Sequence, residues 1–571
     1  MSIPDIVVFF IYLAGTVVVA LAFMKRNKDM HQMFGAGGQV PWWVSGLSAF
    51  MTLFSAGSFV VWGGLAYSQG LVAVTVLMAI GVSGLIVGPC IAPRWKCLGI
   101  GTPADFVYER FGGVVKTYIT WALITVRIIS SAVALYALAA ILDPLLFPGH
   151  GPSFTRSAML ISIMGGVVVA YTMIGGLWAV LMTDVLQFII LTIAVFFIVV
   201  VAVTKFGNLS SLTEAVPATF FEPISADFTG VVLVGWVLTH VFVLGSDWAF
   251  VQRHIAVPTK QDAKKSMILL SCLYFVSPII WLAPAMFYRL IDANANPEQA
   301  YILISAALLP VGMLGLMAAA MFSATASMIS SQINVFAGTL TNAFFPTTGK
   351  NNKLQLWAGK IMTVSIGFII ILLAIIVPFL GGAESVVFAL MSLLISPIFA
   401  PVLWGLFSRR IGASAIWITS IIAGFAGAAI KFGDSFIVFV FNETLAMNIL
   451  SWIDLNPRLS EMLAGVVTPL VILSCIEIYK KVTKRENDKA VSWFDSRPSN
   501  AEVGERVVAD NVGPTIIVIC GLVVCALISF ALITVNLDNP TGLIYCGFIL
   551  MFIAALLYVR ILKGRELQKS G

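Results

Sequence analysis

The sequence predicts an all-α polytopic membrane protein, and three observations carry that prediction. Of the 571 residues, 60% are hydrophobic and only 11% are charged, which leaves too little polar surface to cover a soluble globule. Apolar stretches long enough to cross about 30 Å of hydrocarbon recur along the chain. They are continuous, without the short alternating segments of a membrane β-barrel. At about 20 residues per crossing, we expect about 15 transmembrane helices.

The predicted spans follow one another through mostly short polar connections. In chain order they are residues 4–24, 43–67, 70–92, 118–142, 158–175, 181–204, 230–250, 267–288, 310–345, 358–380, 385–407, 413–430, 462–478, 515–535 and 542–559. The longest polar stretch, residues 480–511, is expected to be a cytoplasmic loop that precedes the last two spans.

The basic residues predict the orientation of the chain. The net charge is +6, but the 33 Lys and Arg residues gather in alternate connections and form no single basic face. With the N-terminus outside, about 27 of them fall on the cytoplasmic side, as the positive-inside rule requires. An odd number of spans then places the C-terminus in the cytoplasm. This pattern is a topology signal and predicts no nucleic-acid partner. It counts Arg253 within a basic cytoplasmic loop, residues 252–266.

Two spans contain a stretch that predicts a break in the helix. Small and hydroxyl residues interrupt the second span at residues 55–58, and Gly-Ser-Asp interrupts the seventh at residues 245–247. The first stretch is equally compatible with a close helix crossing. Counted from the second span, however, each break falls in the first helix of a group of five. That spacing predicts a five-plus-five inverted repeat with discontinuous first and sixth core helices.

Arg127 and Asp184 are among the charged residues that fall inside predicted spans, where a charge is costly and needs a partner. Arg127 lies in the fourth span. It pairs with Asp184 or Asp247, extends to the membrane interface from a helix that starts at another residue, or binds a substrate carboxylate. Asp184 follows a glycine-containing stretch, residues 173–187, in which the glycines are expected to form a short cytoplasmic turn. Its predicted partner is a bound cation, Arg127 or a proton.

Residues 318–332, AAAMFSATASMISSQ, place an unusual number of hydroxyl groups in an apolar span. Ser323 and Ser327 lie one turn apart on one face of a helix. Small and hydroxyl residues allow close helix packing. Their oxygens also suit a small cation such as sodium. The chain contains no P-loop, H-E-x-x-H or nucleophile elbow. We therefore expect an ion-coupled carrier and no enzyme.

Several motifs together resemble the sodium/solute symporter family, whose members share the leucine-transporter-type inverted-repeat fold. They are WWVSGLSAF (residues 42–50), GTPADFVYERFGG (101–113), GGLWAVLMTDVLQ (175–187), DWAFVQRHIA (247–256) and AAAMFSATASM (318–328). The resemblance covers residues 42–410. It implies an N-terminal accessory helix and linker at 1–41, repeats at 42–205 and 229–410, and C-terminal accessory helices at 411–571.

The resemblance also implies two sodium sites. The main site takes backbone carbonyls, here of Met51, Phe54 and Ala320, and a hydroxyl, here of Ser323. The second hydroxyl of that site is replaced by Ala324. A second sodium, or a proton, is expected at Asp184 with Ser323 and Ser327, where one further serine position is Ala326.

For the substrate, the resemblance favours a carboxylate-bearing sugar such as a uronic, keto-sugar or sialic acid. Arg127 lies within about one position of the arginine that grips the carboxylate in a sialic-acid-transporting relative. The polar side chains that surround galactose in another relative are replaced here by Ser58, Val76, Asp247 and Tyr274. We expect Ser55, Ser58, Arg127, Asp247 and Tyr274 to line the substrate site.

Other functions stay open on the same fold. They are sodium-coupled uptake of a neutral sugar or amino acid, a proton-coupled carrier, an uncoupled sensor, and a channel that passes ions without substrate. The expected location is a prokaryotic inner membrane.

Overall fold

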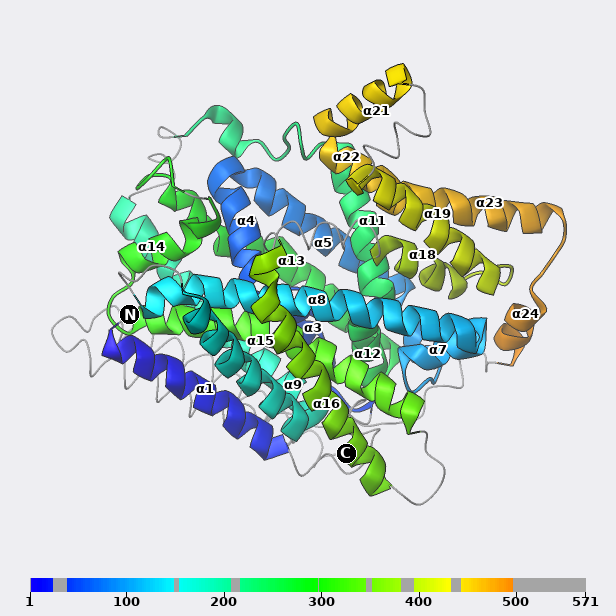
Figure 1. Ribbon diagram of the computed structural model, residues 1–571, viewed down its shortest axis with the longest axis horizontal. Coiled ribbons are helices and arrows are strands. Elements are labelled where there is room, and N and C mark those ends of the chain that lie inside the picture. Colours follow the sequence, from blue (N-terminus) through cyan, green and yellow to red (C-terminus); the bar gives the residue numbers. More distant parts are fainter. Residues whose placement is uncertain are drawn as a thin grey trace, which may run out of the picture.

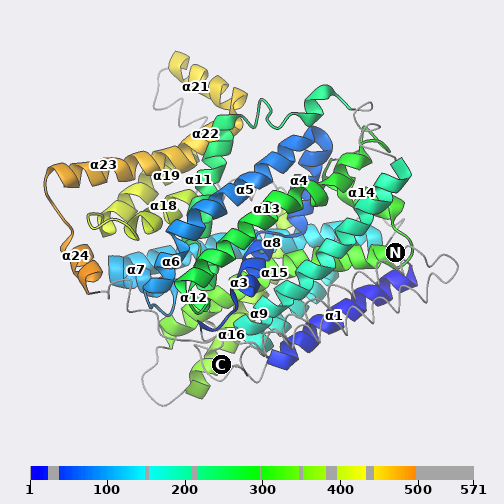
Figure 2. The ribbon, with the colours of Figure 1, turned by 180° about the vertical axis from the view of Figure 1, so that it is seen from behind.

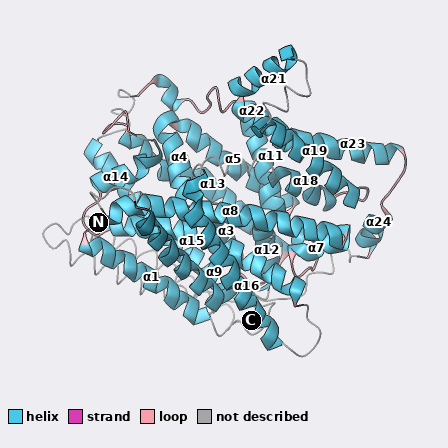
Figure 3. Cartoon of the chain, in the orientation of Figure 1, coloured by secondary structure: helices cyan, strands magenta, loops and turns pink. Residues whose placement is uncertain are grey.

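The computed structural model describes residues 2–23, 38–147, 153–206, 216–295, 297–345, 352–380, 395–432 and 443–496, and these form helices and no strand (Figure 3). The predicted spans 515–535 and 542–559 lie outside the described residues, and span 385–407 is described only from residue 395. Within the described residues, nine helices are long and apolar enough to cross a membrane, and two bent helix pairs raise the number to eleven. This pattern confirms the predicted all-α membrane fold.

The helices of the first half are α1 (Ile3–Phe23), α3 (Trp42–Thr52), α4 (Ala56–Gln69), α5 (Leu71–Cys90), α6 (Ala92–Cys97), α7 (Pro103–Phe111), α8 (Gly113–Leu146) and α9 (Phe154–Phe206). Those of the second half are α11 (Gly230–Ser246), α12 (Trp248–Ala256), α13 (Lys260–Tyr288), α14 (Ala300–Leu308), α15 (Met313–Phe344), α16 (Asn352–Ile376), α18 (Ser396–Gly405), α19 (Ala413–Phe432), α21 (Glu443–Leu455), α22 (Pro457–Met462), α23 (Thr468–Val482) and α24 (Asp488–Asp495). Short 3-10 turns, among them η3 (Ala218–Phe221) and η4 (Pro297–Gln299), connect several of them.

Both predicted helix breaks are present. The chain bends by 66° between α3 and α4 and by 55° between α11 and α12. Ser55 begins α4 in an extended conformation, and its amide donates to the Ser58 hydroxyl at 3.1 Å. Asp247 begins α12, and its carboxylate accepts from the Ala249 amide at 3.0 Å. Each break is therefore fixed by a polar residue that caps the second half of the broken helix.

The predicted turn between the fifth and sixth spans is wrong, because the structure is helical there. α9 is 53 residues long and contains both spans in sequence. Glycine weakens a helix but does not interrupt its hydrogen-bond ladder, whereas proline does. No proline occurs between Phe154 and Phe206, so the ladder continues through residues 175–176.

The first helix packs along the outside of the bundle, against α9 and α15 (Figures 1 and 2). Its Asp5 is buried, and the carboxylate accepts from the amides of Gly312 at 2.7 Å and Gly315 at 3.0 Å. These amides belong to the first turn of α15, whose donors have no partner within the helix. A Cβ on Gly315 would lie 2.0 Å from the Asp5 carbonyl oxygen, so only glycine allows this approach.

At the other end of the bundle, α24 packs against α7 (Figure 1). The Trp493 indole donates to Glu109 at 3.0 Å. Arg110 is buried, donates to the carbonyls of Ser408 and Ile411 at 2.7 and 2.9 Å, and has its pKa lowered to about 10 by burial. It therefore stays charged at neutral pH. The polar segment predicted as a loop from residue 480 thus contains a docked helix.

Candidate functional site

The first helix break lies against α15. The Ala56 amide, at the start of α4, donates to the Thr325 hydroxyl at 2.8 Å. Met51 and Phe54 flank the end of α3, while Ala320 and Ser323 lie one turn apart in α15. The structure therefore places the residues predicted for the main sodium site on two neighbouring elements.

One oxygen of this site, the Ser323 hydroxyl, keeps lone pairs with which it can bind a cation. The Met51 carbonyl accepts from the Phe54 amide at 3.1 Å and also from the Leu53 amide. The Ser323 hydroxyl donates to the Ala319 carbonyl at 2.6 Å, which leaves its own lone pairs free. Ala324 is buried beside them and adds no oxygen. The residues present fit a small cation with one ligand fewer than the family pattern.

We expect Ser323→Ala to raise the sodium concentration for half-maximal uptake by an order of magnitude, because a lost ligand costs about 1.5 kcal/mol. Uptake by reconstituted protein, measured over a sodium series, checks this. Ser305→Ala, which removes a similarly buried hydroxyl bonded to the Tyr301 carbonyl in α14, is the matched control. An unchanged sodium dependence in the Ser323 variant would disprove this ion site.

Asp184 is fully buried in α9, and its partner is Arg253 of α12. The guanidinium Nη2 lies 3.4 Å from the Asp184 carboxylate and donates to Ser331 at 2.6 Å. Its Nε donates at 2.9 Å to Ser48, whose hydroxyl donates in turn to Asp184. Arg253 thereby connects α3, α9 and α15 through one charged group. Neither partner has any solvent-exposed side-chain surface.

This pair corrects two predictions. Arg253 lies inside the bundle and not in a cytoplasmic loop, because α12 continues to Ala256 and α13 begins at Lys260. Asp184 pairs with Arg253 and not with Arg127. The break supplied the missing signal: α12 starts at membrane depth, and at about 1.5 Å per residue five residues advance it by only about 8 Å.

Part of this buried cluster lacks hydrogen-bond partners. Among the described residues, the Oδ1 atom of Asp184 and the Ser327 hydroxyl have none, although the two side chains lie next to each other. Buried polar atoms are rarely left unsatisfied, so such atoms call for an explanation. A carboxylate oxygen and a hydroxyl oxygen are ligands that sodium accepts. The arrangement therefore fits the second predicted cation site.

The residues predicted for the substrate site lie at both breaks and on two further helices. Arg127 of α8 forms an ion pair with Asp247, and their side chains are 12% and 2% exposed. The Arg127 Nε has no hydrogen-bond partner among the described residues, and the guanidinium lies 5.9 Å from the Phe399 ring. The predicted pair of Arg127 with Asp247 is thus present. Tyr274 of α13 packs 4.9 Å from the Phe50 ring, in an aromatic cluster that also contains Phe54 and Trp281.

At the second break, two backbone carbonyls at the end of α11 have hydrogen-bond partners. The Trp95 indole donates to the Gly245 carbonyl at 2.7 Å, and a ring nitrogen of His254 lies 3.0 Å from the Leu244 carbonyl. A helix end within the membrane would otherwise leave these groups unpaired at high cost. Specific hydrogen bonds therefore stabilise the α11–α12 break, and they hold Asp247 in a defined position.

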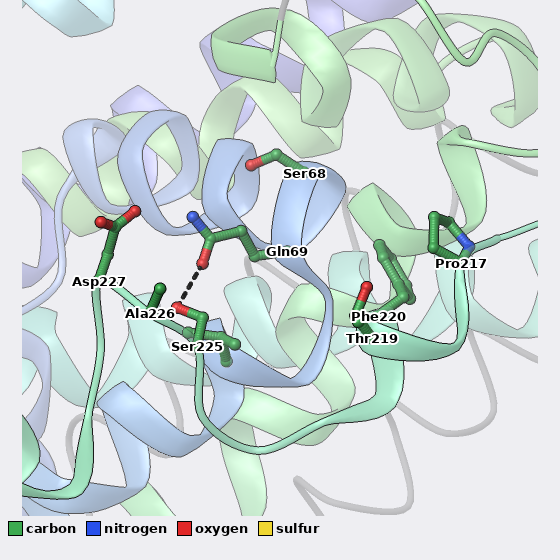
Figure 4. Close-up of a pocket in the computed structure, with 9 residues that line it drawn as sticks. Ser68, Gln69, Pro217, Thr219, Phe220, Ser225, Ala226 and Asp227 are labelled. Carbon is green, nitrogen blue, oxygen red and sulfur yellow. Dashed lines mark hydrogen bonds between the residues drawn. The ribbon is translucent and has the colours of Figure 1, made fainter.

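A separate cavity of about 200 Å³ lies at the end of α4 (Figure 4). Its wall includes η3 and residues 225–227, where the Ser225 hydroxyl donates to Gln69 at 3.1 Å. None of the predicted sodium or substrate residues lines it. This cavity is thus distinct from the site at the helix breaks.

A model of the sodium:solute symporter family matches residues 33–424. The chain belongs to this family. Its coupling ion is therefore sodium, and the resemblance inferred from the motifs is confirmed. This sodium:solute symporter is an integral membrane protein.

The symporter is similar in sequence to characterised relatives. It is 26% identical to the sodium/sialic acid symporter NanT of Aliivibrio fischeri, over 64% of this chain and 74% of the relative. It is 25% identical to the sodium/sialic acid symporter SiaT of Proteus mirabilis, over 77% and 92%. It is 27% identical to the sodium/glucose cotransporter of Vibrio parahaemolyticus, over 67% and 76%.

A solved structure supports the fold of this symporter. That structure is described as the substrate-bound outward-open state of a Na+-coupled sialic acid symporter. The TM-score is 0.67 at 22% sequence identity, with 82% of this chain and 98% of the other covered. The likeness confirms the predicted inverted-repeat fold and is a statement about fold alone.

Proposed function

We propose that this symporter carries a small carboxylate-bearing sugar, such as a uronate, keto-sugar acid or sialic acid, together with sodium. The observation that carries the proposal is the Arg127–Asp247 pair at the second helix break. A guanidinium recognises carboxylates through two parallel hydrogen bonds. The relatives named above act on sialic acid or glucose, so their names include both acidic and neutral sugars. The buried arginine favours the acidic class.

The substrate site lies between the two breaks. Ser55 and Ser58 supply hydroxyls from the first break, Tyr274 an aromatic wall, and Arg127 the positive charge. Asp247 already occupies the guanidinium, so an incoming carboxylate competes with it. Binding of an acidic substrate therefore releases Asp247, which begins the half-helix α12. This exchange connects substrate binding to the position of α12.

Sodium holds the first break against α15 at Met51, Phe54, Ala320 and Ser323, and a second ion binds at Asp184 and Ser327. Alternating access then follows from rocking of the broken helices about these sites. One elementary charge that crosses 100 mV supplies about 2.3 kcal/mol, which is enough to accumulate substrate. At Asp184, sodium and Arg253 bind the same carboxylate. The presence of the ion therefore also affects the position of α12, which contains Arg253.

The orientation belongs to the same proposal. α6, α7 and α24 lie at one end of the bundle, where Lys96 donates to the Ile255 carbonyl and Lys480 to the Arg410 carbonyl. This basic end faces the cytoplasm under the positive-inside rule. The N-terminus is then outside and the C-terminus inside, in a prokaryotic inner membrane. The core is residues 42–410 with accessory segments at 1–41 and 411–571. The protein moves solutes and catalyses no reaction.

Thermal shift tests the proposal directly. Purified protein is heated with neutral sugars, uronates, sialic acid and amino acids, once in sodium and once in potassium. We expect one acidic compound to raise Tm in sodium only. A rise in Tm with a neutral compound instead would mean that Arg127 has a structural role and does not recognise a substrate carboxylate. A shift that is indifferent to sodium would favour a proton-coupled carrier or an uncoupled sensor, for which the replacement at Ala324 is the supporting feature.

A further inference from the structure

The first helix brings a polar group to the centre of the bundle. Val8, Phe9, Tyr12 and Leu13 form its buried side against α9 and α15. The Tyr12 ring meets the Phe322 ring edge-on, with centroids 6.1 Å apart. Phe322 directly precedes Ser323, and the Tyr12 hydroxyl lies beside the Ser323 side chain.

The Tyr12 hydroxyl has no hydrogen-bond partner among the described residues, although the side chain is completely buried. It lies beside the side chains of Ser323 and Gln187 and within electrostatic range of Asp184. A helix that served only to fill space would present an apolar side chain here. A buried tyrosine hydroxyl normally finds a partner.

Gln187 is a second buried polar side chain that lacks hydrogen-bond partners among the described residues. It lies three residues after Asp184 in α9, hence on the same helical face. Its side chain is fully buried, and both amide atoms lack a partner among the described residues. Tyr171, by contrast, is close to Gln187 but already donates to the Ala326 carbonyl at 3.0 Å.

Side-chain oxygens of α1, α9 and α15 that lack a hydrogen-bond partner among the described residues thus lie close together, and one of them belongs to the Asp184 carboxylate. They are Tyr12 Oη, Asp184 Oδ1, Gln187 Oε1 and Ser327 Oγ, next to the free lone pairs of Ser323 Oγ. Hard oxygen donors of this kind, with one carboxylate among them, are the ligands of small cations.

We propose that Tyr12 and Gln187 bind the sodium ion at Asp184, so that α1 forms part of the ion-binding machinery although it lies outside the five-plus-five repeat. The inference rests on the proposed sodium coupling and adds two ligands to it. Tyr12 contributes its hydroxyl oxygen from α1. Gln187 contributes a neutral amide oxygen about one helical turn after Asp184 in α9. Removal of either oxygen weakens sodium binding without any change in net charge.

The test measures Tm of the full-length protein in detergent over a sodium chloride series, with choline chloride added to keep ionic strength constant. Tyr12→Phe keeps the ring against Phe322 and removes only the hydroxyl. Gln187→Met keeps the side-chain length and removes the amide. We expect each to raise the sodium concentration for the half-maximal Tm shift at least fivefold.

Tyr301→Phe is the matched control. Tyr301 in α14 is equally buried, and its hydroxyl also lacks a partner among the described residues, but its ring packs on Phe59 and belongs to no ion site. Its sodium dependence should equal that of the wild type. A sodium-dependent wild type with an unchanged Tyr12→Phe midpoint would overturn this inference and leave the coupling intact. A wild type without any sodium-specific shift would overturn the coupling itself.

Discussion

Asp184→Asn is expected to abolish sodium-driven uptake and to lower the free energy of unfolding by about 3–5 kcal/mol, the usual cost of removing one partner of a buried ion pair. The variant leaves the Arg253 guanidinium fully buried and hydrogen-bonded only to neutral groups, with Asp247 still within electrostatic range of its charge. It also removes the one carboxylate among the proposed sodium ligands. Denaturation of the purified protein and uptake into proteoliposomes measure the two effects separately.

The two effects can be separated by a second substitution. Asp184→Asn with Arg253→Gln removes both charges, so most of the lost stability should return while sodium-driven uptake stays absent. Arg253→Gln alone leaves sodium as the only counter-charge for Asp184. Its Tm in sodium-free buffer should fall, and added sodium should raise Tm by more than in the wild type. If sodium affects this variant and the wild type equally, the ion does not bind at Asp184.

Substitution of Arg127 is expected to have the second largest effect. Arg127→Ala should eliminate uptake of an acidic substrate, but it also strands Asp247, whose side chain is only 2% exposed. The double variant Arg127→Gln/Asp247→Asn avoids that problem. An asparagine still accepts the hydrogen bond that begins α12. We expect this variant to fold and its KM to rise about tenfold to hundredfold, because a charged hydrogen bond contributes about 1.5–3 kcal/mol.

Asp247→Asn alone is expected to have the opposite effect on the KM of an acidic substrate. It removes the carboxylate that competes with the substrate for Arg127, so the KM of an acidic substrate should fall while Arg127 stays charged. Arg127→Lys is the charge-preserving control and should still be impaired, since an ammonium cannot form the two parallel bonds of a guanidinium. If the charge-free double variant transports the acidic substrate normally, the pair serves the helix break and not recognition.

Much of the fold followed from local sequence. The apolar lengths predicted the spans, and the small polar stretches at residues 55–58 and 245–247 predicted both breaks, since a helix interrupted in the membrane needs a polar cap at its second half. Ser323 and Ser327 were found because their one-turn spacing is a local property. Their positions in a sodium site came from the family resemblance, and the ligand roles stay predictions.

What the sequence left out depends on contacts between distant segments. Arg253 is preceded by a break and followed by surface lysines, and only the packing of α12 shows that it meets Asp184, 69 positions away. Tyr12 lies in an apolar helix where a tyrosine looks like ordinary filling. Its significance comes from Gln187 and Ser323, and no spacing rule connects three separate helices.

The Asp5 cap on α15 has a consequence for the order of assembly. Its hydrogen bonds join residues 307 and 310 positions apart in the chain. At synthesis rates of about 5–20 residues per second, Gly312 is made roughly 15–60 s after Asp5. During that interval the Asp5 carboxylate lacks its two partners in α15, and the Tyr12 ring lacks its contact with Phe322. The first helix to leave the ribosome therefore cannot reach its final packing before α15 is made.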